Sequence, residues 1–205
     1  MLPDPVVHLI DDDEAVRQSL AFLLASAGFA VRIYASATAF LDALVAVQPG
    51  CIVTDVRMPG LSGLDLQREL ISRRIGLPVI VMTGHGDVKL AVEVMKAGAV
   101  DFIEKPFQDD TLIAAIRTAF DRYARDAQQS NVANAVGARL KTLTPREREV
   151  LDGLIAGRPN KTIAYDLNIS ARTVEVHRAN LMTKMGAASL SELVRMVLLS
   201  RAPGV

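Results

Sequence analysis

Short apolar runs and helical repeats alternate along the first 125 or so residues of this chain. The apolar runs have strand length and end in turn-forming residues. Between them, apolar residues recur at steps of three and four, which is typical of helices with one buried face. This alternation predicts a parallel sheet covered by helices on both faces. The predicted strands are 6–10, 30–34, 51–54, 78–82 and 100–103, and the predicted helices are 16–27, 39–47, 63–73, 88–96 and a segment opening near 109.

A sheet with this number of strand–helix repeats commonly has the flavodoxin-like strand order 2-1-3-4-5. In that order the topological switch point lies between the first and third strands, and ligands bind in the crevice outside their carboxyl ends. We therefore predict an α/β domain over residues 1–124, with a functional site at that edge of the sheet.

Only helical repeats follow residue 141. Thr144 is predicted to cap a helix that starts at Pro145, and Glu147 completes a capping box. Two of the later helices are separated by a turn of about three residues, the arrangement of a helix-turn-helix whose second helix enters the DNA major groove. Residues 142–205 are therefore predicted to form an all-α domain of four helices, over 145–156, 160–167, 171–185 and 189–199.

Residues 125–141 join the two predicted domains. This segment is polar, rich in alanine and composed of good helix formers. The last helix of the first domain could continue unbroken into Gln129 or beyond. We expect a semi-rigid helical linker, with Ser130-Asn131 as the favoured break and a second helical piece over 131–140, and a flexible tether is the alternative.

The formal net charge of zero conceals an asymmetry. Residues 1–137 carry 12 basic and 17 acidic side chains, whereas residues 138–205 carry 11 basic and 6 acidic ones. A charge difference of this kind suggests two modules with different partners, and the basic one is a candidate for nucleic-acid binding. Two ordinary solvated surfaces are the simpler alternative.

The composition narrows the cellular setting. The chain has one cysteine, Cys51, so no disulfide can form within it, and a reducing compartment is expected. The opening residues lack the basic and apolar regions of a signal peptide, and no clean apolar run reaches the roughly 18 residues that span a bilayer. We expect a cytoplasmic protein without a membrane partner.

Charged and hydroxyl side chains follow several predicted strands at the point where each ends. Asp11 and Asp12 follow the first strand, and Asp55 follows the third. Thr83 and Lys105 follow the fourth and fifth. Neighbouring unpaired carboxylates repel one another, and Mg²⁺ relieves this repulsion while binding one or two carboxylates, waters and a phosphate oxygen. A cation, a lysine and a hydroxyl around one carboxylate make the environment that phosphoryl transfer requires.

Each of these residues also has a simpler interpretation. An Asp after a strand is often a turn former or helix cap, and Asp13 and Glu14 are expected to do only that. Thr83 before Gly84 and Lys105 before Pro106 suit an ordinary turn and a solvated surface. What favours function is that all of these side chains fall at carboxyl ends of strands.

Asp11-Asp12, Asp55, Thr83 and Lys105-Pro106, in this order and spacing, resemble the receiver domain of bacterial two-component response regulators over roughly residues 4–125. The resemblance implies that a sensor histidine kinase phosphorylates Asp55 and that Lys105, beside a cis bond to Pro106, contacts the phosphoryl oxygens. It further implies that Mg²⁺ or Mn²⁺ is held by Asp12, Asp55 and the backbone carbonyl of Arg57, with Asp11 reaching the ion directly or through water.

The same resemblance implies a conformational switch. Thr83 would move toward the phosphoryl oxygens and Phe102, in place of the more usual Tyr, would turn inward behind it. The face around helix 88–96 would then form a homodimer, with Val92 and Lys96 as the candidate interface residues.

The predicted third helix of the second domain has two distinct sides. Val174, His177, Leu181 and Met185 share the side expected to face the core. The opposite side suits base reading, because a Glu carboxylate accepts from cytosine and small apolar side chains meet the thymine methyl group. Basic side chains there and on the preceding helix suit phosphates. The predicted DNA-binding residues are Lys161, Thr162, Arg172, Thr173, Glu175, Val176, Arg178, Ala179, Asn180 and Lys184.

Leu143 to Glu147 and the run from Asn160 to Met185 resemble LuxR/NarL/GerE-type DNA-binding domains. Over essentially its whole length the chain resembles the response regulators of rhizobial nitrogen-fixation control. This implies a FixL-type sensor kinase, activation of transcription by RNA polymerase at nitrogen-fixation or microaerobic genes, and inhibition of the DNA-binding domain by the unphosphorylated receiver.

On this interpretation the chain is not an enzyme, because it accepts a phosphoryl group on its own Asp55 and removes it only slowly. Two alternatives remain open at this stage. A Mg²⁺-dependent phosphatase would use Asp55 as its nucleophile, but such enzymes usually place a second acid two residues later, where this chain has Arg57. A flavin site is disfavoured because the neighbouring carboxylates would repel the anionic phosphate of a flavin in the absence of a metal ion.

Overall fold

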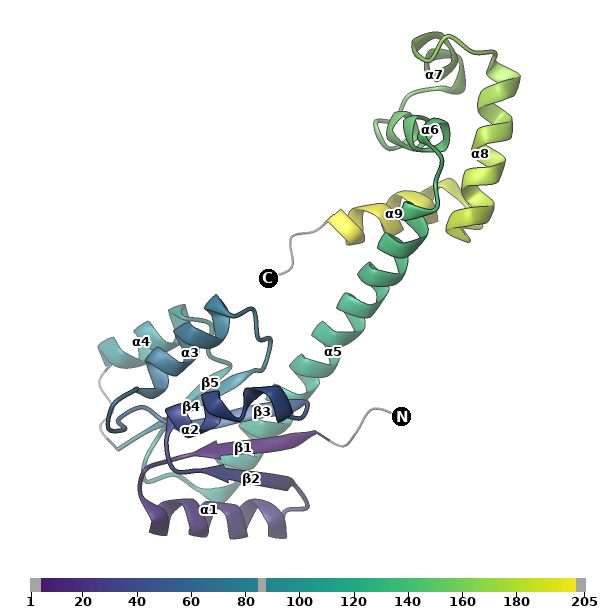
Figure 1. Ribbon diagram of the computed structural model, residues 1–205. Helices are drawn as coiled ribbons and strands as arrows, with labels where there is room; N and C mark the ends of the chain where they lie inside the picture. The colour runs from purple at the N-terminus through teal and green to yellow at the C-terminus, as the bar shows by residue number, and fades with distance from the viewer. Residues whose placement is uncertain (1–4, 85–87, 202–205) are drawn as a thin grey trace. The chain divides into compact units, whose positions relative to one another are not determined.

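A computed structural model describes residues 5–84 and 88–201 (Figure 1). The chain divides into two compact units, Met1–Asp126 and Ala127–Val205. Each unit has its own hydrophobic core, and we describe each by itself. In the described part of the chain, no helix combines the length and the apolar character needed to cross a membrane.

The first unit is built on a parallel sheet. Its strands pair in the order β2-β1-β3-β4-β5, with every neighbouring pair parallel, which confirms the predicted topology. Every residue of β1, β3 and β4 is buried, as expected for central strands of a sheet covered on both faces. The strands are β1 (Val6–Ile10), β2 (Ala30–Tyr34), β3 (Gly50–Asp55), β4 (Val79–Thr83) and β5 (Asp101–Glu104).

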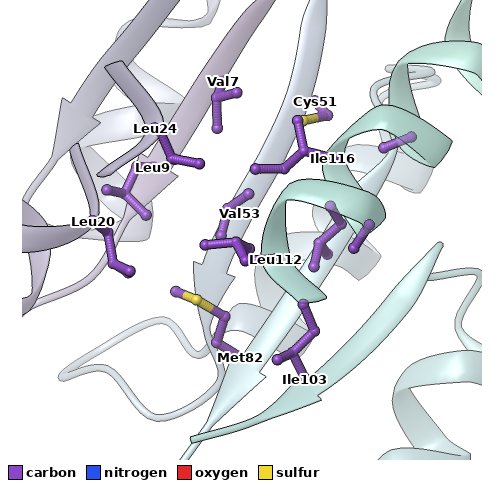
Figure 2. Packing of buried hydrophobic residues seen from close by; sticks show 13 residues of the cluster. Val7, Leu9, Leu20, Leu24, Cys51, Val53, Met82, Ile103, Leu112 and Ile116 are labelled. Carbon is purple, nitrogen blue, oxygen red and sulfur yellow. The ribbon is translucent and has the colours of Figure 1, made fainter. Parts of the chain in front are cut away.

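Helices cover both faces of this sheet, and two separate apolar clusters result. Leu20 and Leu24 of α1 and Leu112 and Ile116 of α5 pack on one face, as Figure 2 shows. Phe40 of α2 and residues of α3 and α4 pack on the other. The helices are α1 (Glu14–Ser26), α2 (Ala37–Asp42), the short 3₁₀ helix η1 (Leu44–Ala46), α3 (Gly63–Ser72), α4 (Val88–Lys96) and α5 (Asp109–Lys141).

Two sequence-based boundaries were wrong. The helix predicted over 39–47 begins at Ala37, because the Ser36 hydroxyl caps it by accepting the Ala39 N–H, and it ends at Asp42 before η1. The break predicted at Ser130-Asn131 is absent, since α5 continues to Lys141. Ser and Asn are only modestly worse helix formers than Ala, by at most about 0.7 kcal/mol, and without Pro or Gly they do not end a helix.

The second unit is all-α, as predicted. The predicted capping box of α6 is present, because the Thr144 hydroxyl accepts the Glu147 N–H and the Glu147 carboxylate accepts the Thr144 N–H. Its core collects side chains from all four helices and also Val136 from the end of α5. The four helices are α6 (Pro145–Ile155), α7 (Asn160–Asp166), α8 (Ala171–Met185) and α9 (Leu190–Arg201).

Candidate functional site

Three charged side chains converge at the carboxyl ends of the central strands. Asp11 follows β1, Asp55 is the last residue of β3, and these strands are direct neighbours. Lys105 follows β5, and its ammonium nitrogen lies 2.8 Å from Asp11 Oδ2 and 2.8 Å from Asp55 Oδ1. Asp11 is 2% exposed and Asp55 8% exposed, so both carboxylates are largely removed from water. At the predicted switch point, the carboxyl ends of β1 and β3 therefore carry two carboxylates joined by one cation.

Backbone groups hold these carboxylates in place. Asp11 Oδ1 accepts the Asp13 N–H at 3.0 Å, and Asp55 Oδ2 accepts the Arg57 N–H at 2.6 Å. Arg17 of α1 donates to the carbonyl oxygens of Asp11 at 2.7 Å and Asp12 at 3.1 Å. Sequence reasoning missed Arg17, and the signal that would have found it is a cation one turn into the helix after an acidic run.

The surroundings of Lys105 favour its charged form. Burial alone would lower the pKa of the Lys105 ammonium. Hydrogen bonds from Lys105 to Asp11 and Asp55, together with the negative charges of those carboxylates, outweigh burial and raise this pKa above its ordinary value. Lys105 therefore stays cationic and offsets part of the repulsion between the two carboxylates.

The other predicted receiver residues lie on the neighbouring strands. Thr83 ends β4 and is fully buried, and its carbonyl accepts the Lys105 N–H at 2.7 Å. Phe102 of β5 is half-buried opposite Val81 and packs against the second apolar cluster. The Lys105-Pro106 peptide bond is cis, as the resemblance to receiver domains implied.

The remaining acidic residues have different surroundings. Asp12 is exposed, and Asp13 caps α1 by accepting the N–H groups of Ala15 and Val16, as expected for that position. Across the described residues, no group of three or more His, Cys, Asp and Glu side chains is close enough to hold a metal ion. The Asp11 and Asp55 carboxylates that converge on Lys105 are hard oxygen donors of the kind that Mg²⁺ prefers, and Mg²⁺ needs only one or two carboxylates.

The second unit presents most of its predicted DNA-binding residues on one side of α8. Val174, Leu181 and Met185 are fully buried in the core, while the fourth predicted core residue, His177, is half-buried. The opposite side of α8 is exposed at Arg172, Glu175, Val176, Ala179 and Asn180. Thr173 and Arg178, which lie nearer the core side of the helix, are half-buried. Lys161 and Thr162 of α7 are exposed as well.

Lys184 has a different environment from the rest of that set. Its ammonium nitrogen lies 2.7 Å from Glu147 Oε2, and Glu147 is only 3% exposed. The Lys184 ammonium and the Thr144 N–H both stabilise the carboxylate, and they lower the pKa of Glu147 below its ordinary value. We therefore assign Lys184 to the contact between α6 and α8 and leave it out of the proposed DNA contacts.

Helix α4 carries an exposed apolar stripe. Val88, Val92 and Met95 are 80%, 46% and 46% exposed and recur at steps of four and three, so they share one side of the helix. Lys96 is exposed in the last turn of the same helix. Val92 and Lys96 were predicted as interface residues from the sequence, and Val88 and Met95 share the exposed side of the helix with Val92.

Both units match known domain families. Residues 7–117 match the response regulator receiver domain, and residues 141–197 match the LuxR family of bacterial regulatory proteins. The chain thus belongs to the two-component response regulators that carry a LuxR-type DNA-binding domain. It is similar to the transcriptional regulatory protein FixJ of Azorhizobium caulinodans, with 62% identity over 95% of this chain and 92% of that protein. FixJ of Rhizobium meliloti is 56% identical over 96% of this chain and 97% of that protein.

Solved structures agree with this assignment. Full-length FixJ from B. japonicum is 52% identical, covers 98% of both chains and has a TM-score of 0.60. The response regulator StyR is 41% identical, covers 95% of this chain and 98% of that one, and has a TM-score of 0.80. Receiver domains generally bind Mg²⁺ at their phosphorylation site, and the family assignment implies a sensor kinase and DNA as partners.

Proposed function

We propose that this chain is a transcription activator switched on by phosphorylation of Asp55. The observation that carries the proposal is the position of Lys105, whose ammonium lies 2.8 Å from both Asp55 and Asp11. An oxygen of the Asp55 carboxylate would attack the phosphorus of a kinase phosphohistidine, the phosphorus–nitrogen bond would break, and the imidazole would leave with a proton. The Lys105 ammonium would then donate hydrogen bonds to the phosphoryl oxygens as well.

We propose that Asp12, Asp55 and the Arg57 carbonyl hold Mg²⁺ or Mn²⁺, with Asp11 reaching the ion directly or through water. Bound there, the ion would neutralise charge on the transferring phosphoryl group. Asp55 acts once per transfer and is itself the acceptor, so only slow self-dephosphorylation is expected and the chain is not an enzyme.

The switch we propose runs through Thr83 and Phe102. Shifting the receiver from a mostly inactive to a mostly active population requires phosphorylation to stabilise the active conformation over the inactive one by about 5.5 kcal/mol. New charge-assisted hydrogen bonds to the phosphoryl oxygens from Lys105 and Thr83 can supply a large part of it, at about 1.5–3 kcal/mol each. Phe102 lies on β5 beside α4, and its inward turn would reshape the surface of Val92 and Lys96, where we propose that the homodimer forms.

Dimerisation would place two LuxR-type domains on two DNA half-sites. We propose that Glu175, Val176, Ala179 and Asn180 face base edges. The remaining contacts would go to phosphates, from Lys161, Thr162, Arg172, Thr173 and Arg178.

The relatives named FixJ suggest the setting. We propose a cytoplasmic protein whose partner is a FixL-type sensor histidine kinase. Its phosphorylated dimer would recruit RNA polymerase to nitrogen-fixation or microaerobic genes, and its unphosphorylated receiver would inhibit the DNA-binding domain.

The test uses the full chain, incubated with acetyl phosphate and Mg²⁺. Intact mass should show one phosphoryl group, peptide mapping should place it on Asp55, and size-exclusion chromatography should show a dimer. The matched variants are Asp55→Asn and Asp42→Asn, the second of which changes an exposed carboxyl on α2. We expect Asp42→Asn to behave as wild type and Asp55→Asn to remain a monomer. Dimerisation of Asp55→Asn under the same conditions would refute the proposal.

A further inference from the structure

The last turns of α5 form part of the second unit. Val136 is 3% exposed within its core, and Leu140 packs against the same cluster. Figure 1 shows this end of α5 beside α9 and the end of α8. Arg139 lies between Val136 and Leu140 in the sequence, and its Nη1 atom donates a hydrogen bond to the Met185 carbonyl oxygen at 2.6 Å.

Met185 is the last residue of α8, so its carbonyl lacks the helical donor that interior carbonyls have. A cation at this end of a helix also interacts favourably with the helix dipole. Gly186 follows with φ of 66°. A Cβ at position 186 would lie 2.9 Å from Arg139 Nη1, so the absence of a side chain there lets the guanidinium approach.

A second contact holds the same end of α8 from another helix. Lys184 pairs with Glu147 of α6. The end of α8 is thus attached to α5 through Arg139 and to α6 through Lys184. The proposed base-reading residues lie further toward the start of α8.

The geometry of a helix magnifies small movements of its anchored end. Val176 lies nine residues before Met185, a distance of about 13 Å at the rise of an α-helix. A tilt of about 5° at Met185 would therefore move Val176 by roughly 1 Å, which exceeds the usual spread of hydrogen-bond lengths. Loosening the anchored end would disturb base contacts before it disturbed long, flexible contacts to phosphates.

We propose that Arg139 is a positioning residue for DNA recognition. By holding the Met185 carbonyl, it fixes the tilt of α8 and hence the placement of the base-reading side chains. Arg139 itself touches no base. The inference rests on the proposed DNA contacts of α8.

The test compares full-length wild type, Arg139→Ala, Arg139→Lys and the control Lys141→Ala, all treated with acetyl phosphate and Mg²⁺. Lys141 is exposed in the same last turn of α5 and carries the same charge. The probes are a duplex selected from a random pool by phosphorylated wild type and a scrambled duplex of equal composition. Binding is measured by fluorescence anisotropy at several salt concentrations, well below the unfolding temperature of each variant.

We expect Arg139→Ala to bind the selected duplex about tenfold more weakly, equivalent to about 1.4 kcal/mol. Binding to the scrambled duplex and the salt dependence should stay close to wild type. Arg139→Lys should recover part of the selectivity, since lysine can still donate to the carbonyl, and Lys141→Ala should keep all of it. Amide hydrogen exchange in the last turn of α8 should be faster in Arg139→Ala than in wild type.

Three results would overturn the inference alone. In the first, wild type and Arg139→Ala discriminate equally well, even if the variant unfolds at a lower temperature. In the second, both duplexes weaken together and the salt slope falls by about 0.9, which marks a direct phosphate contact. In the third, exchange at the end of α8 is unchanged. If wild type itself fails to prefer its selected duplex, the proposed DNA contacts fail first, and the inference falls with them.

Discussion

Replacing Glu147 by Gln should destabilise the second unit substantially. The Glu147 side chain is 4% exposed and accepts hydrogen bonds from Lys184 at 2.7 Å and the Thr144 N–H at 2.8 Å. Glutamine keeps the size and one acceptor, so the capping bond survives, but it removes the charge that pairs with Lys184. Losing one partner of a buried pair costs about 3–5 kcal/mol, whereas a hydrogen bond to a charged group contributes about 1.5–3 kcal/mol.

The range of about 1.5–3 kcal/mol applies to Glu147→Gln. The Lys184 side chain is 36% exposed, so its ammonium can return to water when the carboxylate is lost. We therefore expect a loss of about 2 kcal/mol. For a unit of fewer than 100 residues, this corresponds to a fall in Tm of roughly 8–16 °C. Differential scanning calorimetry of the full chain measures this fall in Tm. The transition of the second unit is recognised as the one whose Tm rises when duplex DNA is added.

The control is Glu149→Gln, which changes an exposed carboxylate paired with Arg146 at 2.9 Å. Such surface pairs contribute about 0–1 kcal/mol, so its transition should move little. The pH dependence of the stability difference between wild type and Glu147→Gln gives a second check. Because the folded-state pKa of Glu147 is depressed, its stabilisation is present above the ordinary value of 4.5 and is lost as pH falls through the folded-state pKa. Equal shifts in the two variants, or a difference between wild type and Glu147→Gln that persists in strong acid, would refute the reasoning.

Three further outcomes concern the receiver. Burial lowers the pKa of His8, so the unfolded chain takes up a proton first, and denaturant titrations should show stability falling below pH 6.5 in wild type but less in His8→Gln. Gly63→Ala would bring a Cβ into steric conflict with the Asp55 carbonyl oxygen and should cost about 1–3 kcal/mol, whereas Gly76→Ala, with open space around it, should cost little in the same titrations. Lys105→Met removes the cation between Asp11 and Asp55, so Mg²⁺ should raise the receiver Tm more in this variant than in wild type; an equal rise would contradict the charge balance described above.

The sheet was predictable from sequence because its strands are buried on both faces and read as continuous apolar runs bounded by turn residues. The strand order 2-1-3-4-5 is the common one for this number of repeats, and it places Asp11 and Asp55 at the ends of neighbouring strands. Lys105 was expected at the same edge because it follows the fifth predicted strand. The cis bond before Pro106 came from the family resemblance alone, since neither periodicity nor composition specifies it.

Local sequence could not provide the contacts between distant side chains. The Lys184–Glu147 pair joins residues on two helices, and an exposed-looking lysine in a helical pattern gives no sign of a buried partner. Arg139 was likewise missed, because its acceptor is a backbone carbonyl at the end of another helix. The continuity of α5 was missed for a different reason: its helix formers were recognised, but Ser130-Asn131 was given more weight as a breaker than its propensity justifies.

The position of Cys51 has a practical consequence. It is the only cysteine in the sequence, it is fully buried in β3, and burial raises the pKa of its thiol to about 12. Thiol reagents react with the thiolate form, so in the native protein the Cys51 sulfur should resist alkylation and air oxidation. Reporter dyes can consequently be attached through new surface cysteines without first removing the natural one. The rate at which Cys51 itself becomes alkylated then serves as a built-in clock for opening of the receiver sheet.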